Sequence, residues 1–302
     1  TMNKKFLGYG LLLAALIAAP FLGAYPIFVM KLLCFALFAS AFNLLLGYTG
    51  LLSFGHAAFF GGSAYVAGHV MKVWGFTPEL GLLVGTLTGA GLGWVFGVLA
   101  IRRQGIYFAM ITLALAQMIF FVALQAPFTG GEDGLQAVPR GKLFGLFSLA
   151  DDLSIYYLVL VIVAAAFALI VRTIHSPFGQ VLKGIKENEP RALSLGYDVA
   201  RFKLLAFVIS AALTGLAGSL KTLGLGFASL SDVHWTASGQ VILMTLVGGL
   251  GTLSGPMVGS TVVVILENKL GEIGTAIARL TGIDWFNTLG ESVTMVTGLI
   301  FI

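Results

Sequence analysis

The stretch "GYTGLLSFGHAAFFGGSAYVAGH", from Gly47 to His69, is apolar enough for a membrane span, yet it contains six glycines, two serines and two histidines. Lipid offers no hydrogen-bonding partner to polar side chains or to backbone that leaves the helix. Such a segment is tolerated at membrane depth only where protein or a cavity surrounds it. The stretch therefore predicts a span inside a helical bundle, with its irregular backbone facing other helices or a path.

The composition places the whole chain in a membrane. Of its 302 residues, 58% are apolar and 10% are charged, and the mean hydropathy is +0.98. A water-soluble domain of this length needs no such excess of apolar residues. The single cysteine, Cys34, excludes a disulfide framework and a thiolate metal site. The net charge of +4 lies in short connections between apolar runs, so a nucleic-acid partner is not predicted.

Apolar runs along the chain predict an all-α, polytopic integral membrane protein in which residues 1–302 form one transmembrane domain. The eighth and ninth runs are short for a full crossing, which predicts broken or re-entrant segments. The ten runs cover residues 6–23, 27–46, 50–71, 79–100, 105–125, 153–171, 202–223, 237–252, 255–268 and 285–302.

The distribution of positive charge predicts that both ends of the chain are cytoplasmic. With the amino end inside, the outside connections hold six cations and Lys31 lies within a span. The long connection 126–152, with four acids and two bases, suits the periplasm, whereas 172–203, with six cations, suits the cytoplasm. The inside connections hold ten of the seventeen cations, namely Lys4, Lys5, Arg102, Arg103, Arg172, Lys183, Lys186, Arg191, Arg201 and Lys203.

The fourth apolar run carries a glycine at every fourth position. This spacing places all of them on one face of a helix, where a second helix can approach backbone to backbone. Helix packing inside the bundle is one interpretation, and a pore lining or a subunit contact is the other. The stripe consists of Gly81, Gly85, Gly89, Gly93 and Gly97.

The cytoplasmic connection 172–203 predicts two short helices. Pro177 ends the preceding span, and "QVLKGIKENEP" can form a helix that stops at Pro190. The next turn, "RALSLG", is closed by Gly196. Such a pair of helices can bind lipid headgroups or dock a soluble partner. Anionic headgroups favour a mostly basic surface, so the interleaved Glu187 and Glu189 favour protein docking.

The run "GQVLKGIKENEPRALSLGYDVARFKLLAFVISAALTGLAGSL" resembles the cytoplasmic coupling loop and following helix of the membrane subunits of ABC importers for branched-chain amino acids. The blocks "GYTGLLSFGHAAFFGGSAYVAG", "TGGEDGL" and "LMTLVGGLGTLSGPMVGS" are similar to three further family blocks in the same order. Together they cover most of residues 40–268, and the pattern is most similar to the M-type permease subunit. The chain ends at "GLIFI", where relatives continue into a polar tail, as expected of a trimmed C-terminus.

The resemblance implies an ABC importer membrane-subunit fold in the bacterial inner membrane. It also implies a second permease subunit of the H type, two cytoplasmic ATPase subunits that bind ATP and Mg²⁺, and a periplasmic binding protein. Lys186 to Gly196 would then seat in a groove of an ATPase subunit. The residues expected to couple to the ATPase are Lys183, Lys186, Glu187, Glu189, Arg191 and Gly196.

The chain is not predicted to be an enzyme or to hold a cofactor or metal of its own. The segment "GLAGSLKT" at 215–222 has some likeness to a Walker A loop. It fails because Leu220 stands where a glycine is required before the lysine, and because it lies in an apolar span. ATP hydrolysis is therefore expected on other subunits.

The outer sequence "TGGEDGL" is open to three interpretations. Turns at its glycines can offer backbone amides to a substrate carboxylate. Glu132 and Asp133 can attract an ammonium group or cations on a docked binding protein. Glycine and aspartate are also ordinary turn residues, so a plain loop fits equally. The candidate residues here are Thr129, Gly130, Gly131 and Glu132.

His56 has only small residues on either side, Gly55 and Ala57. A buried neutral histidine bonded to a backbone carbonyl is one interpretation, and a polar group lining the path is the other. A proton relay would need an embedded carboxylate, and Glu267 is the acid placed inside an apolar run. Phe54, Phe59, Phe60, Ser53 and Thr49 are expected to give a path that holds an apolar amino acid weakly.

The sequences "GYTGLLSFG" from Gly47 and "GGLGTLSG" from Gly248 share the pattern G-x-x-G-x-L-S. Paired glycine-interrupted segments in two halves of a transporter indicate a substrate site near the midplane. The predicted topology places both turns on the cytoplasmic side, whereas an inverted repeat places them on opposite sides. The candidate path residues are Thr49, Ser53, His56, Phe59, Gly249, Gly251 and Thr252.

The predicted function is an ATP-driven importer permease for branched-chain or other apolar amino acids. A permease for urea or short amides is an alternative within the same family. A secondary transporter coupled to protons or sodium is a different class, in which His56 or Glu267 would govern ion dependence. A non-transporting structural subunit is the third class. The substrate itself is not readable from these residues, because specificity in this family resides largely in a binding protein.

Overall fold

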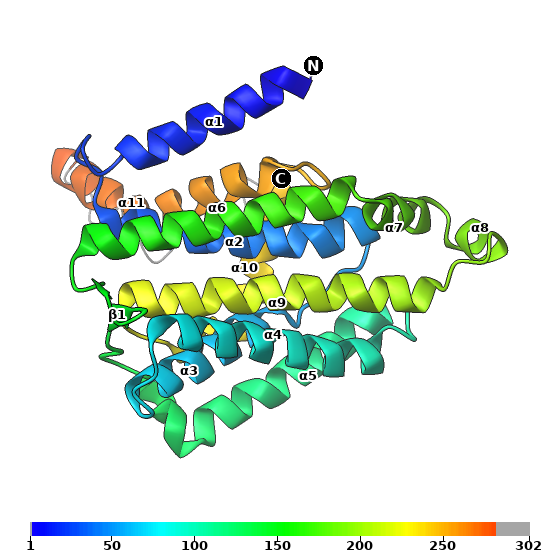
Figure 1. Ribbon diagram of the computed structural model, residues 1–302, viewed down its shortest axis with the longest axis horizontal. Coiled ribbons are helices and arrows are strands. Elements are labelled where there is room, and N and C mark those ends of the chain that lie inside the picture. The colour runs from blue at the N-terminus through cyan, green and yellow to red at the C-terminus, as the bar shows by residue number, and fades with distance from the viewer. Residues whose placement is uncertain (1, 282–302) are drawn as a thin grey trace.

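The computed structural model describes residues 2–281 and is built almost entirely of helices (Figure 1). Two short antiparallel strands pair Lys142 with Ser148 and Leu143 with Phe147. The elements are α1 (Met2–Ala18), α2 (Pro26–Thr49), α3 (His56–Lys72), α4 (Pro78–Ala100), α5 (Ile106–Gln125), η1 (Pro127–Thr129), η2 (Gly131–Asp133), β1 (Lys142–Leu143), β2 (Phe147–Ser148), α6 (Asp152–His175), α7 (Pro177–Glu187), α8 (Glu189–Ser194), α9 (Val199–Leu225), η3 (Leu230–Asp232), α10 (Trp235–Gly248) and α11 (Gly255–Thr281).

Within the described residues, five helices are long and apolar enough to cross a membrane: α2, α4, α5, α6 and α9. The predicted all-α membrane class is therefore confirmed, while the count of ten runs is only approximate. The run 50–71 divides into irregular backbone and the 17-residue α3, and the run 237–252 contains the 14-residue α10. The run 255–268 continues as α11 to Thr281, and the run 285–302 lies outside the described residues.

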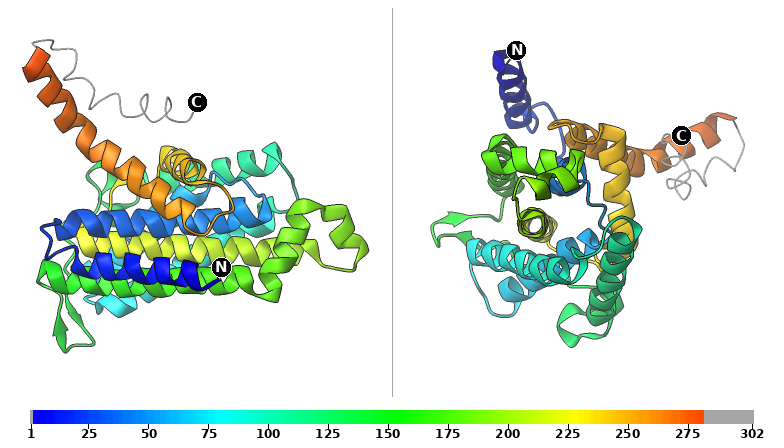
Figure 2. Two further views of the ribbon diagram at one scale, coloured as in Figure 1. Left: turned by 90° about the horizontal axis from the view of Figure 1, so that it is seen from above. Right: turned by 90° about the vertical axis from the view of Figure 1, so that its right-hand side faces the viewer.

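Helix α9 lies at the centre of the bundle and packs against α2, α3 and α4 (Figures 1 and 2). Its buried face is rich in small residues, which let neighbouring backbones come close. A Cβ added at Gly218 would lie 2.8 Å from the carbonyl carbon of Phe60 in α3. Helix α9 thus needs glycine where α3 crosses it.

The glycine stripe of α4 faces its neighbours inside the chain. A Cβ at Gly89 would lie 2.6 Å from the carbonyl oxygen of Ala211 and 3.0 Å from Cα of Gly215, both in α9. Gly93 and Gly97 also face α9, and Gly81 faces Met71 of α3. The opposite face exposes large apolar side chains, which suits contact with lipid, including Leu83, Leu87 and Trp94.

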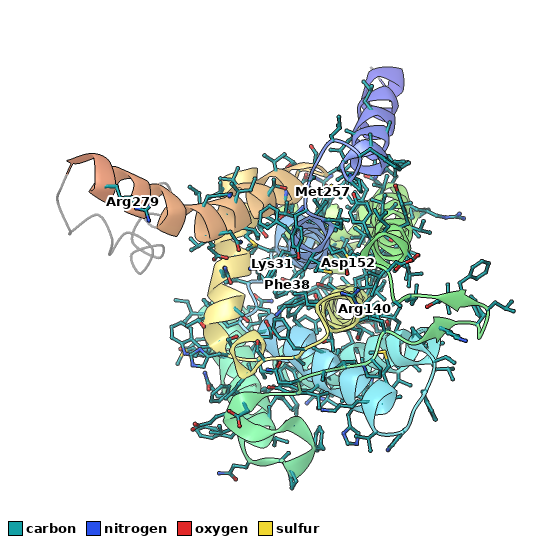
Figure 3. The ribbon with its side chains drawn as sticks, turned by 90° about the vertical axis from the view of Figure 1, so that its left-hand side faces the viewer. Lys31, Phe38, Arg140, Asp152, Met257 and Arg279 are labelled. Carbon is teal, nitrogen blue, oxygen red and sulfur yellow. The ribbon has the colours of Figure 1, made fainter. Side chains whose placement is uncertain are left out.

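The two ends of the bundle differ. Helices α7 and α8 project beyond one end, here called the α8 end, and the β1–β2 hairpin lies at the other, called the hairpin end (Figure 1). At the hairpin end, Arg140 pairs with Asp152 at 2.5 Å, and Figure 3 shows these side chains together. Helix α1 lies beside the bundle and is tied to α6, because the Tyr156 hydroxyl donates to the Leu16 carbonyl at 2.6 Å.

Candidate functional site

The backbone between α2 and α3 is not helical, although it lies inside the protein. Helix α2 ends at Thr49, Gly50 has a φ of 73°, and α3 begins at His56. Part of the backbone between them bonds to other helices: the Phe54 amide donates to Thr112 Oγ1 of α5 at 3.1 Å. Ser238 of α10 bonds to the backbone where α3 begins, since its hydroxyl donates to the Phe54 carbonyl at 2.7 Å and accepts from the Ala57 amide at 2.9 Å. The polar residues of this region replace the water that lipid excludes.

Two predicted path residues bond to the backbone of their own segment. Ser53 is fully buried, and its Oγ accepts from the Gly55 amide at 3.1 Å. Thr49 is buried, and its hydroxyl donates to the Leu45 carbonyl one turn earlier in α2. Both hydroxyls therefore support the ends of the helix break.

His56 is fully enclosed where α2, α3 and α9 meet. Its Nε2 lies 2.8 Å from Ser210 Oγ, and the Ser210 hydroxyl donates to the Ala41 carbonyl at 2.6 Å. Because that donation uses the only hydroxyl hydrogen, Nε2 of His56 must be the donor to Ser210. The rings of Phe42, Phe59 and Phe207 meet the imidazole edge to face. In this arrangement His56 links three helices, and it and Phe59 are closed off from the cavities described below.

The second glycine segment packs against the end of α2. Helix α10 ends at Gly248, and Gly249 and Gly251 have φ values of 101° and 72° before α11 begins. The Asn43 side chain of α2 donates to the Thr252 carbonyl at 2.8 Å and accepts from the Gly251 amide at 3.0 Å. Both G-x-x-G-x-L-S segments therefore meet at one end of the bundle, whereas an inverted repeat requires opposite ends.

A cavity of about 1010 Å³ lies between α2, α3, α9, α10 and α11. Phe54 and Phe60, both expected to form the path, line it. The other candidate path residues do not, namely Thr49, Ser53, His56, Phe59, Gly249, Gly251 and Thr252. Phe54 also lines a second cavity of about 440 Å³ that is bordered by apolar residues of α5. The larger cavity combines aromatic and charged side chains, including Phe35, Phe54, Phe60, Phe227, Trp235, Lys31, Lys221, Asp232, Gln240 and Glu267.

A buried ion pair stands in the wall of the larger cavity. Lys221 Nζ lies 2.5 Å from Asp232 Oδ1, and the two side chains are 6% and 9% exposed. Asp232 Oδ2 accepts from the Ser229 amide at 3.2 Å and from its hydroxyl at 2.9 Å. The ammonium group also lies 5.9 Å and 5.4 Å from the ring centres of Phe60 and Phe227. The carboxylate is held rigidly, while the ammonium sits on a flexible stem.

Further polar groups reach the cavity from the other side. Gln240 of α10 donates to Glu267 of α11, and Lys31 of α2 lines the same space. Figure 3 shows Lys31 in the interior of the bundle. The cavity wall thus holds two lysines and two carboxylates among apolar side chains.

The sequence interpretation missed the Lys221–Asp232 pair. A lysine inside the predicted span 202–223 is itself a signal, because ionisable residues in membrane spans usually face an interior path. Asp232 carries no such signal, since it lies between predicted spans and is buried by the packing of η3 against neighbouring elements such as α3.

Residues 27–302 match the family described as branched-chain amino acid transport system / permease component. The chain belongs to this family. This membership makes the chain the permease component of an ABC transporter and a multi-pass membrane protein. No solved structure gave a match.

Relatives of this permease carry several substrate names. It is 27% identical to the high-affinity branched-chain amino acid transport system permease protein LivM of Salmonella typhimurium, over 88% of this chain and 68% of the relative. It is 28% identical to LivM of Escherichia coli, over 83% of this chain and 65% of the relative. It is also 28% identical to the ribose import permease protein RbsC of Bacillus subtilis, over 71% and 66%. The chain spans about two thirds of the length of these relatives.

At the α8 end of this permease, the predicted coupling residues divide into two groups. Lys186 Nζ donates to the Gly47 carbonyl at 2.7 Å, Lys183 lies 5.7 Å from the Tyr48 ring centre, and Glu189 pairs with Lys203 at 2.8 Å. These three hold α7 and α8 to the bundle. Glu187, Arg191 and Gly196 are exposed, and Gly196 has a φ of 87° that closes α8.

At the hairpin end, the predicted loop residues form the turn after α5. Thr129 is buried, and its hydroxyl donates to the Ala123 and Ala126 carbonyls at 2.5 and 2.7 Å. Gly130 and Gly131 have φ values of 78° and 61°, and Glu132 is exposed. The turn is followed by a bridge between Leu135 and Ala228, which joins this loop to the chain beyond α9.

Proposed function

We propose that this chain is the permease subunit of an ATP-driven importer for branched-chain or other apolar amino acids in the bacterial inner membrane. The observation that carries the proposal is the cavity of about 1010 Å³, whose lining combines opposite charges with aromatic side chains. An apolar amino acid has matching features: a carboxylate and an ammonium group at one end, and an apolar side chain at the other. Family membership and the names of the LivM relatives support the same substrate class.

The proposed assembly contains a second permease subunit of the H type, two cytoplasmic ATPase subunits and a periplasmic binding protein. The chain has no Walker A sequence, so ATP and Mg²⁺ would bind the ATPase subunits. This chain would supply half of the path and the surface on which an ATPase acts. It would carry out no chemical step and hold no cofactor itself.

The proposed ATPase contact is the tip of the α8 end. Leu193 and Leu195 are 56% and 68% exposed there, outside the apolar spans, and Tyr197 is also exposed. Exposed leucines beyond the membrane favour burial in a partner. Glu187 and Arg191 flank them and add charge for orientation. The leucines extend the set of coupling residues that the sequence predicts.

Replacing Leu193 and Leu195 together by Asp tests this contact in the co-expressed complex. We expect the ATPase subunits to be lost from the purified permease, because burying two carboxylates in an apolar groove is unfavourable. The melting temperature of the permease should stay unchanged, since both side chains are exposed. Full retention of the ATPase subunits and of ATP-driven uptake would contradict the proposal.

Charge reversal separates the two acids. Glu189→Lys breaks the pair with Lys203 inside this chain, so its effect should be recovered by adding Lys203→Glu. Glu187→Lys alters an exposed residue and should weaken ATPase binding without that rescue. Equal rescue of both variants by Lys203→Glu would remove Glu187 from the proposed contact.

Two other functions make different predictions. A sugar or urea permease, as the likeness to the ribose permease allows, would transport uncharged solutes, which leave the charged groups of the cavity without partners. A secondary transporter would work without ATPase subunits. Uptake by liposomes that contain this chain alone and no ATP would establish that second function and overturn the importer proposal.

A further inference from the structure

We infer that the charged cavity is a zwitterion site in which Lys221 binds the substrate carboxylate, an inference that rests on the proposed amino-acid import. The site would lie between the Lys221–Asp232 pair and the Glu267–Gln240 pair, with Phe35 and other apolar residues between them. Its ligand class is a solute that carries one carboxylate, one ammonium group and an apolar side chain.

Lys221 is free to take a second anionic partner. An ammonium group has three N–H donors, and one is directed to Asp232. The rings of Phe60 and Phe227 lie beside the ammonium group of Lys221. An aromatic ring attracts a cation but is no oxygen acceptor, so the other two N–H donors can still bond to a carboxylate. A carboxylate entering from the cavity would bond to Lys221, while Asp232 stays fixed by Ser229.

The ion pair is not needed merely to hold the chain that follows α9. That chain is already bound to the outer loop by backbone hydrogen bonds: Leu135 and Ala228 exchange two at 2.9 Å, and the Val138 amide donates to the Gly226 carbonyl at 2.8 Å. A buried ion pair also adds little net stability, because desolvation offsets the attraction. Ionised groups retained in a cavity wall therefore indicate a binding role.

The charge balance of the cavity indicates which solutes it accepts. Lys31 and Lys221 balance Asp232 and Glu267, so the lining is neutral overall and offers groups of both signs. A zwitterion can present its carboxylate to a lysine and its ammonium group to a carboxylate, whereas a solute with one charge can satisfy groups of one sign alone. Removal of the solute carboxylate should remove the contact with Lys221.

The test uses the complete complex in proteoliposomes, with its binding protein and ATP, and follows uptake of radiolabelled leucine, isoleucine and valine. The variant Lys221→Gln/Asp232→Asn removes both charges together, so that neither charge is left buried without its counter-ion. Lys221→Met/Asp232→Asn is a second version that keeps apolar packing against Phe60. Lys72→Gln is the matched control, since the Lys72 ammonium donates to the Gln136 carbonyl and lies outside the cavity.

We expect both double variants to lower uptake about tenfold or more, as the loss of a charged hydrogen bond implies. ATP hydrolysis stimulated by the binding protein should remain near the wild-type rate, and the Lys72→Gln control should transport normally. Wild-type uptake by either double variant would overturn the inference and leave Lys221 as a counter-ion of Asp232. Absence of ATP-driven uptake by the wild-type complex would instead overturn the proposed function, together with the inference that rests on it.

Discussion

Hydroxyl and amide side chains bond to the backbone at two places where it leaves a helix inside this permease, before α3 and before α11. Ser238 bonds the Phe54 carbonyl and the Ala57 amide where α3 begins, and Asn43 bonds both a carbonyl and an amide of the turn before α11. Ser210 joins the imidazole of His56 to the Ala41 carbonyl. Each residue serves groups on a different helix, so each fixes how two helices meet.

Ser238→Ala should lower the free energy of unfolding by about 2 kcal/mol, because it leaves the Phe54 carbonyl and the Ala57 amide buried without their partner. The measurement is thermal unfolding of the purified permease in detergent. Thr245→Val is the control from the same helix, since Thr245 donates only to the Val241 carbonyl of its own helix. Equal melting temperatures for the two variants would show that the break does not depend on Ser238.

Glycine on one helix allows a neighbouring helix to approach closely in this bundle. The stripe of α4 meets Ala211, Gly215 and Ser219 of α9, while its outer face carries large residues such as Leu87 and Trp94. The two faces therefore differ in their tolerance of side-chain volume. The same logic applies to Gly218 of α9, against which α3 packs.

Gly89→Leu should destabilise the permease by about 2 kcal/mol, because its side chain would overlap the backbone of α9. Gly91→Leu, on the same helix, is the matched control: a Cβ at Gly91 has no atom within 4 Å. We expect the yield of folded protein and its melting temperature to fall for Gly89→Leu alone. Equal behaviour of the two variants would mean that α4 does not pack closely on α9.

The whole molecule connects its α8 end to the charged cavity by direct contacts. Lys186 of α7 bonds the carbonyl of Gly47 at the end of α2. A Cβ at Gly47 would lie 2.8 Å from the Gly251 amide nitrogen, so the turn between α10 and α11 packs against Gly47. Helices α10 and α11 then line the cavity with Gln240 and Glu267. These contacts predict that a movement of α7 reaches α10 and α11.

Asn43→Leu should reduce ATP-driven uptake several-fold in the assembled complex, because it removes both hydrogen bonds between α2 and the turn. Co-purification of the ATPase subunits should persist, since the α8 tip is untouched. Ser40→Ala is the control one turn earlier in α2, where the buried hydroxyl has no hydrogen-bond partner among the described residues. Uptake by Asn43→Leu equal to that of the control would argue against transmission through this contact.

Hydropathy and the positions of glycine and proline are local properties, and they account for much of what the sequence predicts correctly. The membrane class, the all-α fold and the break after Gly47 follow from apolar runs and from glycine and proline positions. Helix α11 exceeds its predicted run because an amphipathic segment can remain helical after its hydropathy falls. Family membership also followed from the sequence, through the collinear blocks of residues 40–268.

The sequence by itself determined that this chain is a helical membrane protein, because 58% apolar residues exceed what a soluble domain of this length buries. The family blocks in the same sequence identified it as a permease. Only the tertiary structure decided which polar residues meet. Phe54 and Ser238 are 184 positions apart, and Asn43 and Gly251 are 208 apart, so no local pattern pairs them. Asp232 joins Lys221 because the chain returns against α9, and the cavity exists only between helices already packed.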